Sequence, residues 1–324
     1  MLAPRNTRRF LAVAGALAAV LALLAYGDYQ VDLRRARERI ASGSQVAMSA
    51  CGPIEYAVAG DGPPVLVVHG AGGGFDQGLE FGQALVRRGF RVIAMSRFGY
   101  LRTPLPPDAS PAAQADAHAC LLDALHIQRV AVVGASAGAP SSMQFALRHP
   151  DRTRALVLLV PAAYVPRPDN APPLTTPPGT ELLFETALRS DFLFWAGMRV
   201  ARDTMVRSIL AIPLAVAATA GDDERRRLDD VLAHTLPVSA RRLGLINDAR
   251  VILSLPRYDL EHITTPALVI SIQDDLYGTY APARYTAEHM PHARFVGYAS
   301  GGHLWVGHQR DVTDEIVGFL NSKG

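Results

Sequence analysis

Short apolar runs alternate with segments of helical periodicity along most of this chain. The runs are bounded by turn residues, a pattern typical of central strands that are buried on both faces of a parallel sheet. They occupy residues 65–68, 91–95, 129–133, 154–160, 267–272 and 293–298. Helical periodicity covers residues 78–88, 111–125, 137–149, 281–290 and 304–320. This alternation predicts an α/β fold with a mostly parallel, doubly wound sheet.

The alternation stops at Pro161 and resumes only at residue 267. Residues 161–179 are rich in Pro and Ala and are expected to be extended, whereas residues 181–262 are mostly helical in pattern. Because this helical section lies between two core strands, it predicts an inserted helical cap. The core begins with a strand pair at 45–59 that turns near Gly52 and Pro53. The predicted segments are a core at 45–161, a cap at 162–262 and a second core part at 263–324.

The N-terminus has a different character, with an apolar run from Phe10 to Tyr26 after Arg5, Arg8 and Arg9. We expect residues 1–27 to form an uncleaved transmembrane or signal-anchor helix and residues 28–44 a charged helical stalk. A cleaved signal peptide and a secreted product are the alternative, although the segment has no good small-x-small cleavage site. The domain that follows this helix is expected on the periplasmic or extracytoplasmic side.

Composition narrows the class of partner. Of the 324 residues, 19% are charged, and the net charge is only +2, with the Arg residues scattered along the chain. Because nucleic-acid binding requires a basic patch or stripe, we expect no nucleic-acid partner. Cys51 and Cys120 have no metal-ligand spacing, and two buried free thiols are favoured over a disulfide.

The segment Gly134-Ala135-Ser136-Ala137-Gly138 carries the main chemical signal. By itself this pattern is weak, but here it follows a predicted strand and precedes a predicted helix. Such a strand–turn–helix elbow exposes its serine, and the flanking glycines allow close backbone approach. The positive end of the following helix lies near the hydroxyl. We therefore interpret Ser136 as a nucleophile.

The chain resembles the α/β-hydrolase fold family, in particular the capped serine hydrolases that include esterases, lactonases and carbon–carbon bond hydrolases. The resemblance covers residues 46–320 and matches the cap only in length and helical character. The motifs that carry it are His69-Gly70-Ala71-Gly72-Gly73-Gly74, Ser96-Arg97-Phe98-Gly99-Tyr100, the Ser136 elbow, Asp274-Asp275 and Gly301-Gly302-His303.

The resemblance implies a Ser-Asp-His triad and an oxyanion hole. His303 would be the base, because it follows the last strand in a Gly-rich loop, and His308 is the weaker candidate. The acid would be Asp275, with Asp274 as the alternative. The N–H groups of Ala71 or Gly72 and of Ala137 would bind the oxyanion. His69 is unsuited as the base because it precedes the serine in the chain.

Arg97 and Tyr100 follow a strand end and are either substrate-pocket or structural residues. The activity implied by the resemblance is hydrolysis of a small carboxylic ester or lactone, with no metal or organic cofactor. Carbon–carbon bond hydrolysis of a diketone is the second possibility. A catalytically silent, membrane-anchored binding protein is a third, from a different class. The sequence leaves the oligomeric state open.

Overall fold

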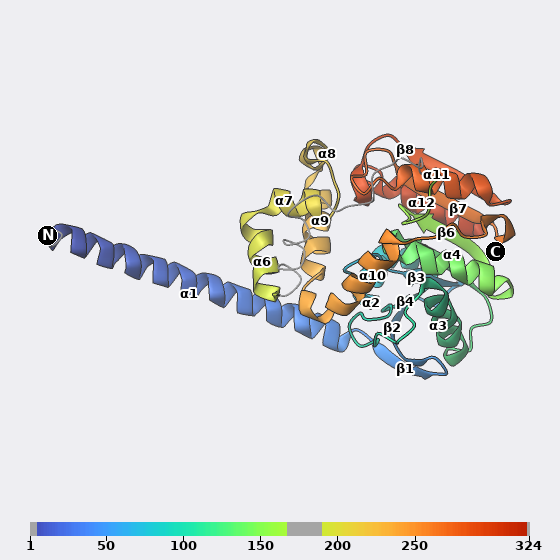
Figure 1. The fold of residues 1–324 in the computed structure, drawn as a ribbon, viewed down its shortest axis with the longest axis horizontal. Helices are drawn as coiled ribbons and strands as arrows, with labels where there is room; N and C mark the ends of the chain where they lie inside the picture. The colour runs from blue at the N-terminus through green and yellow to red at the C-terminus, as the bar shows by residue number, and fades with distance from the viewer. Residues whose placement is uncertain (1–4, 167–189, 323–324) are drawn as a thin grey trace.

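The computed structural model describes residues 5–166 and 190–322, which form a sheet of eight strands with helices on both faces (Figure 1). The strand order is β1-β2-β4-β3-β5-β6-β7-β8. Strand β2 pairs antiparallel with β1 and β4, and all other pairs are parallel. The strands are β1 (Gln45–Ser49), β2 (Gly52–Ala59), β3 (Pro64–Val68), β4 (Arg91–Met95), β5 (Val130–Ala135), β6 (Thr153–Leu159), β7 (Ala267–Ile272) and β8 (Ala293–Tyr298). The predicted mostly parallel sheet is confirmed.

Two layers of helices cover the sheet. Helices α2 (Phe75–Arg87) and α12 (Gln309–Asn321) pack on one face. The other face is covered by α3 (Pro111–Ala124), α4 (Ala139–Arg148) and α11 (Tyr280–His289). Strands β5 and β7 are buried along their whole length, because they are apolar on both sides and helices cover both faces.

Two predicted helix boundaries are wrong. Helix α2 begins at Phe75 rather than at residue 78, since the Gly-rich segment before it hides the start of the periodicity. The final helix begins at Gln309 rather than at residue 304. Trp305 and Gly307 adopt positive φ angles, which end a short 3-10 turn at Gly302–Leu304 before α12 starts.

Between β6 and β7 the described regular elements are helices. They form α6 (Asp191–Val200), α7 (Arg202–Ser208), α8 (Leu214–Thr219), α9 (Asp222–His234) and α10 (Arg242–Leu253). This section contacts the loops that follow the carboxyl ends of the parallel strands: Leu276 N and His303 N both donate to Ala211 O. Most of the extended connection expected at 161–179 lies outside the described residues. We call residues 190–262 the cap.

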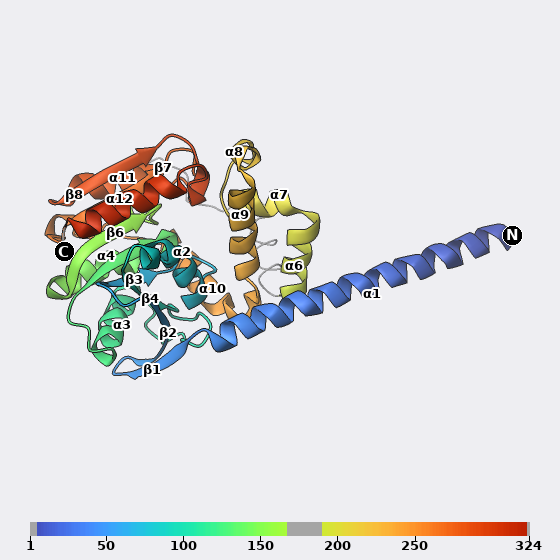
Figure 2. The same cartoon turned by 180° about the vertical axis from the view of Figure 1, so that it is seen from behind.

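Helix α1 (Arg5–Ser42) includes both the expected anchor and the expected stalk in one continuous element (Figures 1 and 2). Its apolar part projects away from the rest of the protein. Its last third packs on the cap, since Tyr29, Leu33 and Ala36 are buried at helical spacing against α6. The expected stalk is therefore not solvated on all sides.

The two cysteines form a disulfide, so the prediction of buried free thiols is wrong. Cys51 lies exposed in the turn between β1 and β2, and Cys120 lies on α3. Helix α3 packs against β1, which brings two cysteines that are 69 residues apart in sequence into bonding distance. The bond ties the edge hairpin to the helical layer.

Candidate active site

Ser136 lies where β5 ends, at the first position of a 3-10 turn (Ser136–Gly138) that leads into α4. Its φ angle of 49° is in the left-handed region, which is strained for a residue with a side chain. A Cβ atom at Gly138 would lie 2.5 Å from Val68 O, and one at Gly134 would lie 2.3 Å from Ser142 Oγ. Both glycines are therefore required for the close packing of this strained elbow.

His303 and Asp275 come from the loops after β8 and β7, and both are buried. His303 Nδ1 lies 2.8 Å from Asp275 Oδ2. Because a carboxylate only accepts, Nδ1 carries the proton, and Nε2 of the neutral ring is left as an acceptor. Among the described residues Nε2 makes no hydrogen bond, so it is available to a hydroxyl or a substrate.

Asp275 is held as a carboxylate by three donors. Besides His303, the Thr279 hydroxyl donates to Oδ2 and Tyr277 N donates to Oδ1 at 2.9 Å. Burial alone would raise the pKa of Asp275, but these hydrogen bonds outweigh burial and lower the pKa below its ordinary value. The group therefore stays ionised and able to orient the imidazole.

Asp274 has different partners from its neighbour. Its two oxygens accept from Gly302 N and from Ser300 Oγ, each at 2.7 Å. It thus fixes the loop that leads to His303 without contacting the ring. The structure joins Asp275, and not Asp274, to the histidine.

The loop between β3 and α2 packs against the serine, since a Cβ atom at Gly70 would lie 3.2 Å from Ser136 Cβ. In this loop the Gly72 N–H donates to Tyr100 Oη at 3.2 Å, whereas the Ala71 N–H has no partner among the described residues. The Ala137 N–H lies in the first turn after Ser136, where backbone donors have no partner within the helix. Within residues 5–166 and 190–322, the N–H groups of Ala71 and Ala137 are therefore two backbone donors near this turn that have no hydrogen-bond partner.

Comparison with known proteins identifies the family of this chain. The model of a protein family described as the alpha/beta hydrolase fold matches residues 63–306. The chain belongs to the α/β-hydrolase fold family.

Relatives and solved structures agree with this membership. The uncharacterized hydrolase YcgS of Bacillus subtilis (strain 168) is 29% identical over 279 residues, covering 84% of this chain and 96% of that protein. A 2-hydroxy-6-oxononadienedioate/2-hydroxy-6-oxononatrienedioate hydrolase of Paraburkholderia xenovorans (strain LB400) is 30% identical over 241 residues, covering 69% of this chain and 75% of that protein. The structure of an alpha/beta hydrolase fold protein from Nakamurella multipartita is 29% identical, with a TM-score of 0.68, covering 87% of this chain and all of that chain.

In this α/β hydrolase, Arg97 and Tyr100 point inward. Both are buried and meet Asp248 of the cap helix α10: the Arg97 guanidinium binds it in bidentate geometry at 2.6 and 2.7 Å, and Tyr100 Oη donates to it at 2.6 Å. Burial would lower the pKa of Arg97, but the Asp248 carboxylate outweighs burial and raises it. Burial and Asp248 also hold the pKa of the Tyr100 phenol well above its usual value.

This cluster fixes the loop that precedes α2. Arg97 donates from Nε to His69 O at 2.9 Å and from Nη2 to Gly70 O at 3.1 Å, while Tyr100 holds the Gly72 N–H. Asp248 thereby connects the cap to the backbone around the free Ala71 N–H. Arg97 and Tyr100 thus hold the loop in place, which is a structural role, the alternative to the substrate-pocket role.

His69 is part of the same cluster and is fixed as a neutral ring. Its Nε2 accepts from Arg97 N at 3.0 Å and its Nδ1 donates to Gly70 O at 2.7 Å, so each nitrogen has a single possible role. Burial, and then the Arg97 charge, hold the pKa of His69 well below its ordinary value. His69 therefore has no nitrogen left to accept a proton from Ser136.

A second ion pair joins the cap to this loop. Arg241, which is fully buried at the start of α10, donates to Gly73 O at 2.5 Å and to Asp76 at 2.7 Å. Asp76 also accepts from Arg39 of α1 at 3.3 Å. The loop that carries the free N–H is thus held by two residues of one cap segment.

No strong local signal in the sequence marks Asp248, Arg241 or Thr279 as site residues. Asp248 is an acidic residue inside a largely apolar helix, which is a weak signal of a buried partner, but its partner lies in another part of the chain. Thr279 directly precedes α11, where a hydroxyl residue is usually interpreted as a helix cap. Among residues 5–166 and 190–322, no three His, Cys, Asp or Glu side chains are grouped as metal ligands.

Proposed function

We propose that this hydrolase acts through Ser136 as nucleophile, His303 as general base and Asp275 as the residue that orients the base. The observation that carries the proposal is the buried His303–Asp275 hydrogen bond, formed by loops that follow β7 and β8, as Ser136 follows β5. All three strands run parallel and therefore end at the same edge of the sheet. Ser136 alone has too high a pKa to react at neutral pH and needs such a base.

The reaction would proceed by acyl transfer to water. Ser136 Oγ attacks the carbonyl carbon while His303 Nε2 takes the hydroxyl proton, and the N–H groups of Ala71 and Ala137 stabilise the oxyanion. The tetrahedral intermediate expels the alcohol, which receives the proton from His303, and an acyl-enzyme remains. Water then attacks with His303 again as base, the acid leaves, and Ser136 is regenerated.

The substrates we propose are carboxylic esters or lactones. Carbon–carbon bond hydrolysis is the second candidate function, and the relative from Paraburkholderia xenovorans, a hydrolase of 2-hydroxy-6-oxo dienedioates, favours it at 30% identity. The two reactions use the same nucleophile and base but different leaving groups. Comparing turnover of acyl esters of graded chain length with that of a vinylogous diketone would separate them.

A fluorophosphonate probe tests the enzyme function directly, because it reacts only with an activated serine. We expect labelling of the folded protein and none of Ser136→Ala. Absence of labelling, or labelling that survives Ser136→Ala, would instead support a catalytically silent binding protein.

The two aspartates are distinguished by their Asn variants. Asp275→Asn should reduce kcat strongly, whereas Asp274→Asn should retain most of the wild-type kcat. The reverse result would identify Asp274 as the acid.

We further propose that α1 is an uncleaved membrane anchor and that the catalytic body is extracytoplasmic. Residues Ala12–Ser42 include an 18-residue window with a mean hydropathy of 1.6, and none of this window is buried. By length and composition, the helix is apolar enough to cross a membrane. The apolar run 10–26 is longer than a signal-peptide core, and the same helix continues into contact with the cap. The Cys51–Cys120 bond supports an oxidising compartment for the body.

A further inference from the structure

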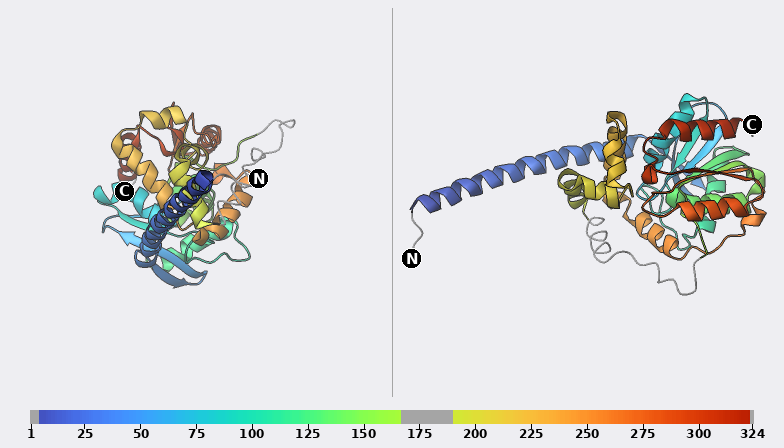
Figure 3. Two further views of the ribbon diagram at one scale, coloured as in Figure 1. Left: turned by 90° about the vertical axis from the view of Figure 1, so that its left-hand side faces the viewer. Right: turned by 90° about the horizontal axis from the view of Figure 1, so that it is seen from above.

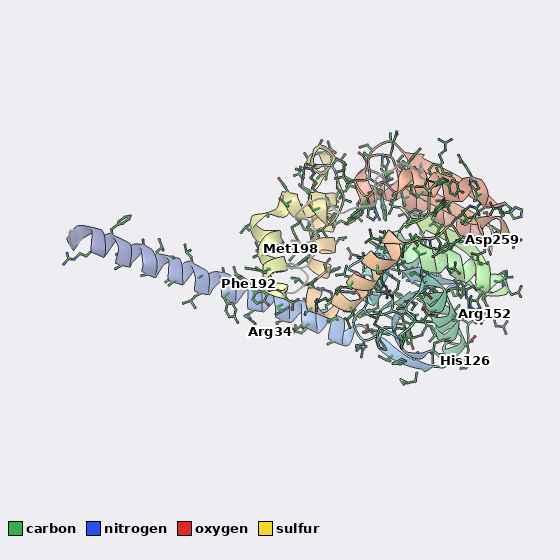
Figure 4. All side chains as sticks on the ribbon, in the orientation of Figure 1. Arg34, His126, Arg152, Phe192, Met198 and Asp259 are labelled. Atoms are coloured by element: carbon green, nitrogen blue, oxygen red, sulfur yellow. A yellow bond between two sulfur atoms is a disulfide. The ribbon has the colours of Figure 1, made fainter. Side chains whose placement is uncertain are left out.

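A cluster of aromatic side chains lies where the apolar part of α1 meets the cap. Tyr29 packs with its ring centroid 5.2 Å from Phe192 and 5.7 Å from Trp195, both on α6, and 5.9 Å from Tyr26. Trp195 Nε1 also donates to Asp32 Oδ2 of α1 at 2.8 Å. Figure 4 shows Phe192 beside α1 at this junction. Helix α6 is therefore held at one fixed position along α1.

That position corresponds to the headgroup layer of a membrane crossed by α1. The apolar run 10–26 is about 25 Å long, close to the roughly 30 Å hydrocarbon core. Tyr29 and Asp32, which contact α6, lie about 5 and 9 Å farther along the helix. The headgroup region extends about 5–8 Å beyond the hydrocarbon on each side. Tyr and Trp side chains are also enriched at this depth.

Helix α6 carries exposed apolar side chains. Phe192 is 40%, Leu193 45% and Val200 85% exposed, and Leu193 and Val200 are seven residues apart and so share one face of the helix. Figures 1 and 2 place α6 and α7 on the side of the protein from which α1 extends, and Figure 3 shows the same arrangement from above. Exposed apolar groups in such a position indicate contact with another surface.

We propose that α6 is a bilayer-docking helix, which inserts Leu193 and Val200 into the interface of the same membrane that α1 crosses. The proposal rests on the proposed anchoring by α1. A bilayer is the occupant because the apolar surface of α6 continues, through the Tyr29–Phe192 contact, the exposed apolar surface of α1. A short helix with apolar side chains facing lipid is typical of interfacial binding. Docking would turn the cap toward the lipid surface.

Site-directed spin labelling of the full-length protein in phosphatidylcholine vesicles tests this proposal. The native cysteines are paired, so Leu193→Cys or Val200→Cys supplies the one reactive thiol. Met48→Cys is a matched control, because Met48 is 79% exposed and lies on β1, beyond the end of α1. The measured quantity is the ratio of a label's accessibility to oxygen, which concentrates in lipid, to its accessibility to a water-soluble nickel chelate. We expect this ratio to be several-fold higher for the labels at 193 and 200 than for the label at 48.

Equal accessibility of all three labels to the nickel chelate, in protein that floats with the vesicles, would overturn the docking proposal and leave the anchor intact. Protein that does not float with vesicles would overturn both the anchor and the docking. Circular dichroism identifies any variant that fails to fold; Val200→Cys, at the more exposed position, then remains as an independent test. Fluorophosphonate labelling of the same samples reports on the hydrolase separately.

Discussion

Asp248→Ala should strongly destabilise the fold, because Asp248 pairs with the buried Arg97 and Tyr100. Asp248 lies far from Ser136 in the sequence. The side chains of Asp248 and Arg97 are only 6% and 7% exposed, and their contact is bidentate. Removal of one partner leaves a buried guanidinium charge without compensation, which typically costs about 3–5 kcal/mol. Tyr100 Oη also loses its acceptor. For a protein of this size the loss corresponds to a decrease in Tm of about 4–7 °C.

Urea unfolding of Asp248→Ala, of a double variant at positions 97 and 248, and of a control variant measures the effect. Asp248→Ala should lose about 3–5 kcal/mol, and Arg97→Met combined with Asp248→Leu should recover most of it, because no buried charge then remains. Asp229→Ala is the matched control: Asp229 binds Arg202 at 2.7 Å, but both side chains are more than a third exposed, so less than about 1 kcal/mol should be lost.

The same variant should weaken catalysis, because Arg97 and Tyr100 hold the backbone on either side of Ala71. We expect kcat to fall more than KM rises, by at most the roughly 100- to 1,000-fold that loss of an oxyanion donor costs. A stability loss below about 1 kcal/mol for Asp248→Ala, or a double variant no more stable than the single one, would refute this reasoning.

Three further predictions concern the elbow, the disulfide and a buried histidine. Gly138→Ala should destabilise the fold by about 1–3 kcal/mol and abolish probe labelling, because its Cβ would meet the backbone oxygens of Val68 and His69. The control Gly318→Ala, in open space on α12, should instead stabilise the fold by about 0.5–1 kcal/mol. Normal labelling of Gly138→Ala would contradict this account. Reduction of the Cys51–Cys120 bond should lower the free energy of unfolding by about 4 kcal/mol, because the bond closes a loop of 69 residues in the unfolded chain. An unchanged urea midpoint in the presence of a reductant would count against the bond. Burial lowers the pKa of His118 to about 3, so the unfolded chain binds the extra proton and stability should fall as pH drops from about 6.5 toward 3. His118→Gln should reduce that slope by up to about 1.4 kcal/mol per pH unit, and identical slopes in the two proteins would show that His118 does not titrate on unfolding.

The sheet and the elbow could be predicted because their signals are local. Strand β5, the strained turn and α4 follow one another in the chain, and the two glycines of the motif report directly on the close packing around Ser136. In the sequence, the preference for Asp275 over Asp274 depends on family spacing rather than on physical chemistry. Only the positions of the two carboxylates relative to Gly302 and His303 distinguish them.

The wrong or missing predictions depend on contacts between distant segments. Nothing near Cys51 or Cys120 in the sequence indicates that α3 packs against the first hairpin. Asp248 is not recognisable in the sequence for the same reason, since its partner Arg97 is 151 residues away. A buried ion pair becomes recognisable only when both chain segments are known, because either residue alone is indistinguishable from a solvated charge.

Helix α1 has no joint between its apolar part and the part that packs on the cap, and this has a mechanical consequence. A body tethered by a flexible linker explores a hemisphere above its attachment point, whereas a body fixed to a continuous helix keeps a constant height and tilt. Such a hydrolase, anchored as proposed, would sample a thin layer next to the lipid surface. Its encounter rate would then depend on how strongly a substrate partitions into that layer, rather than on the bulk concentration.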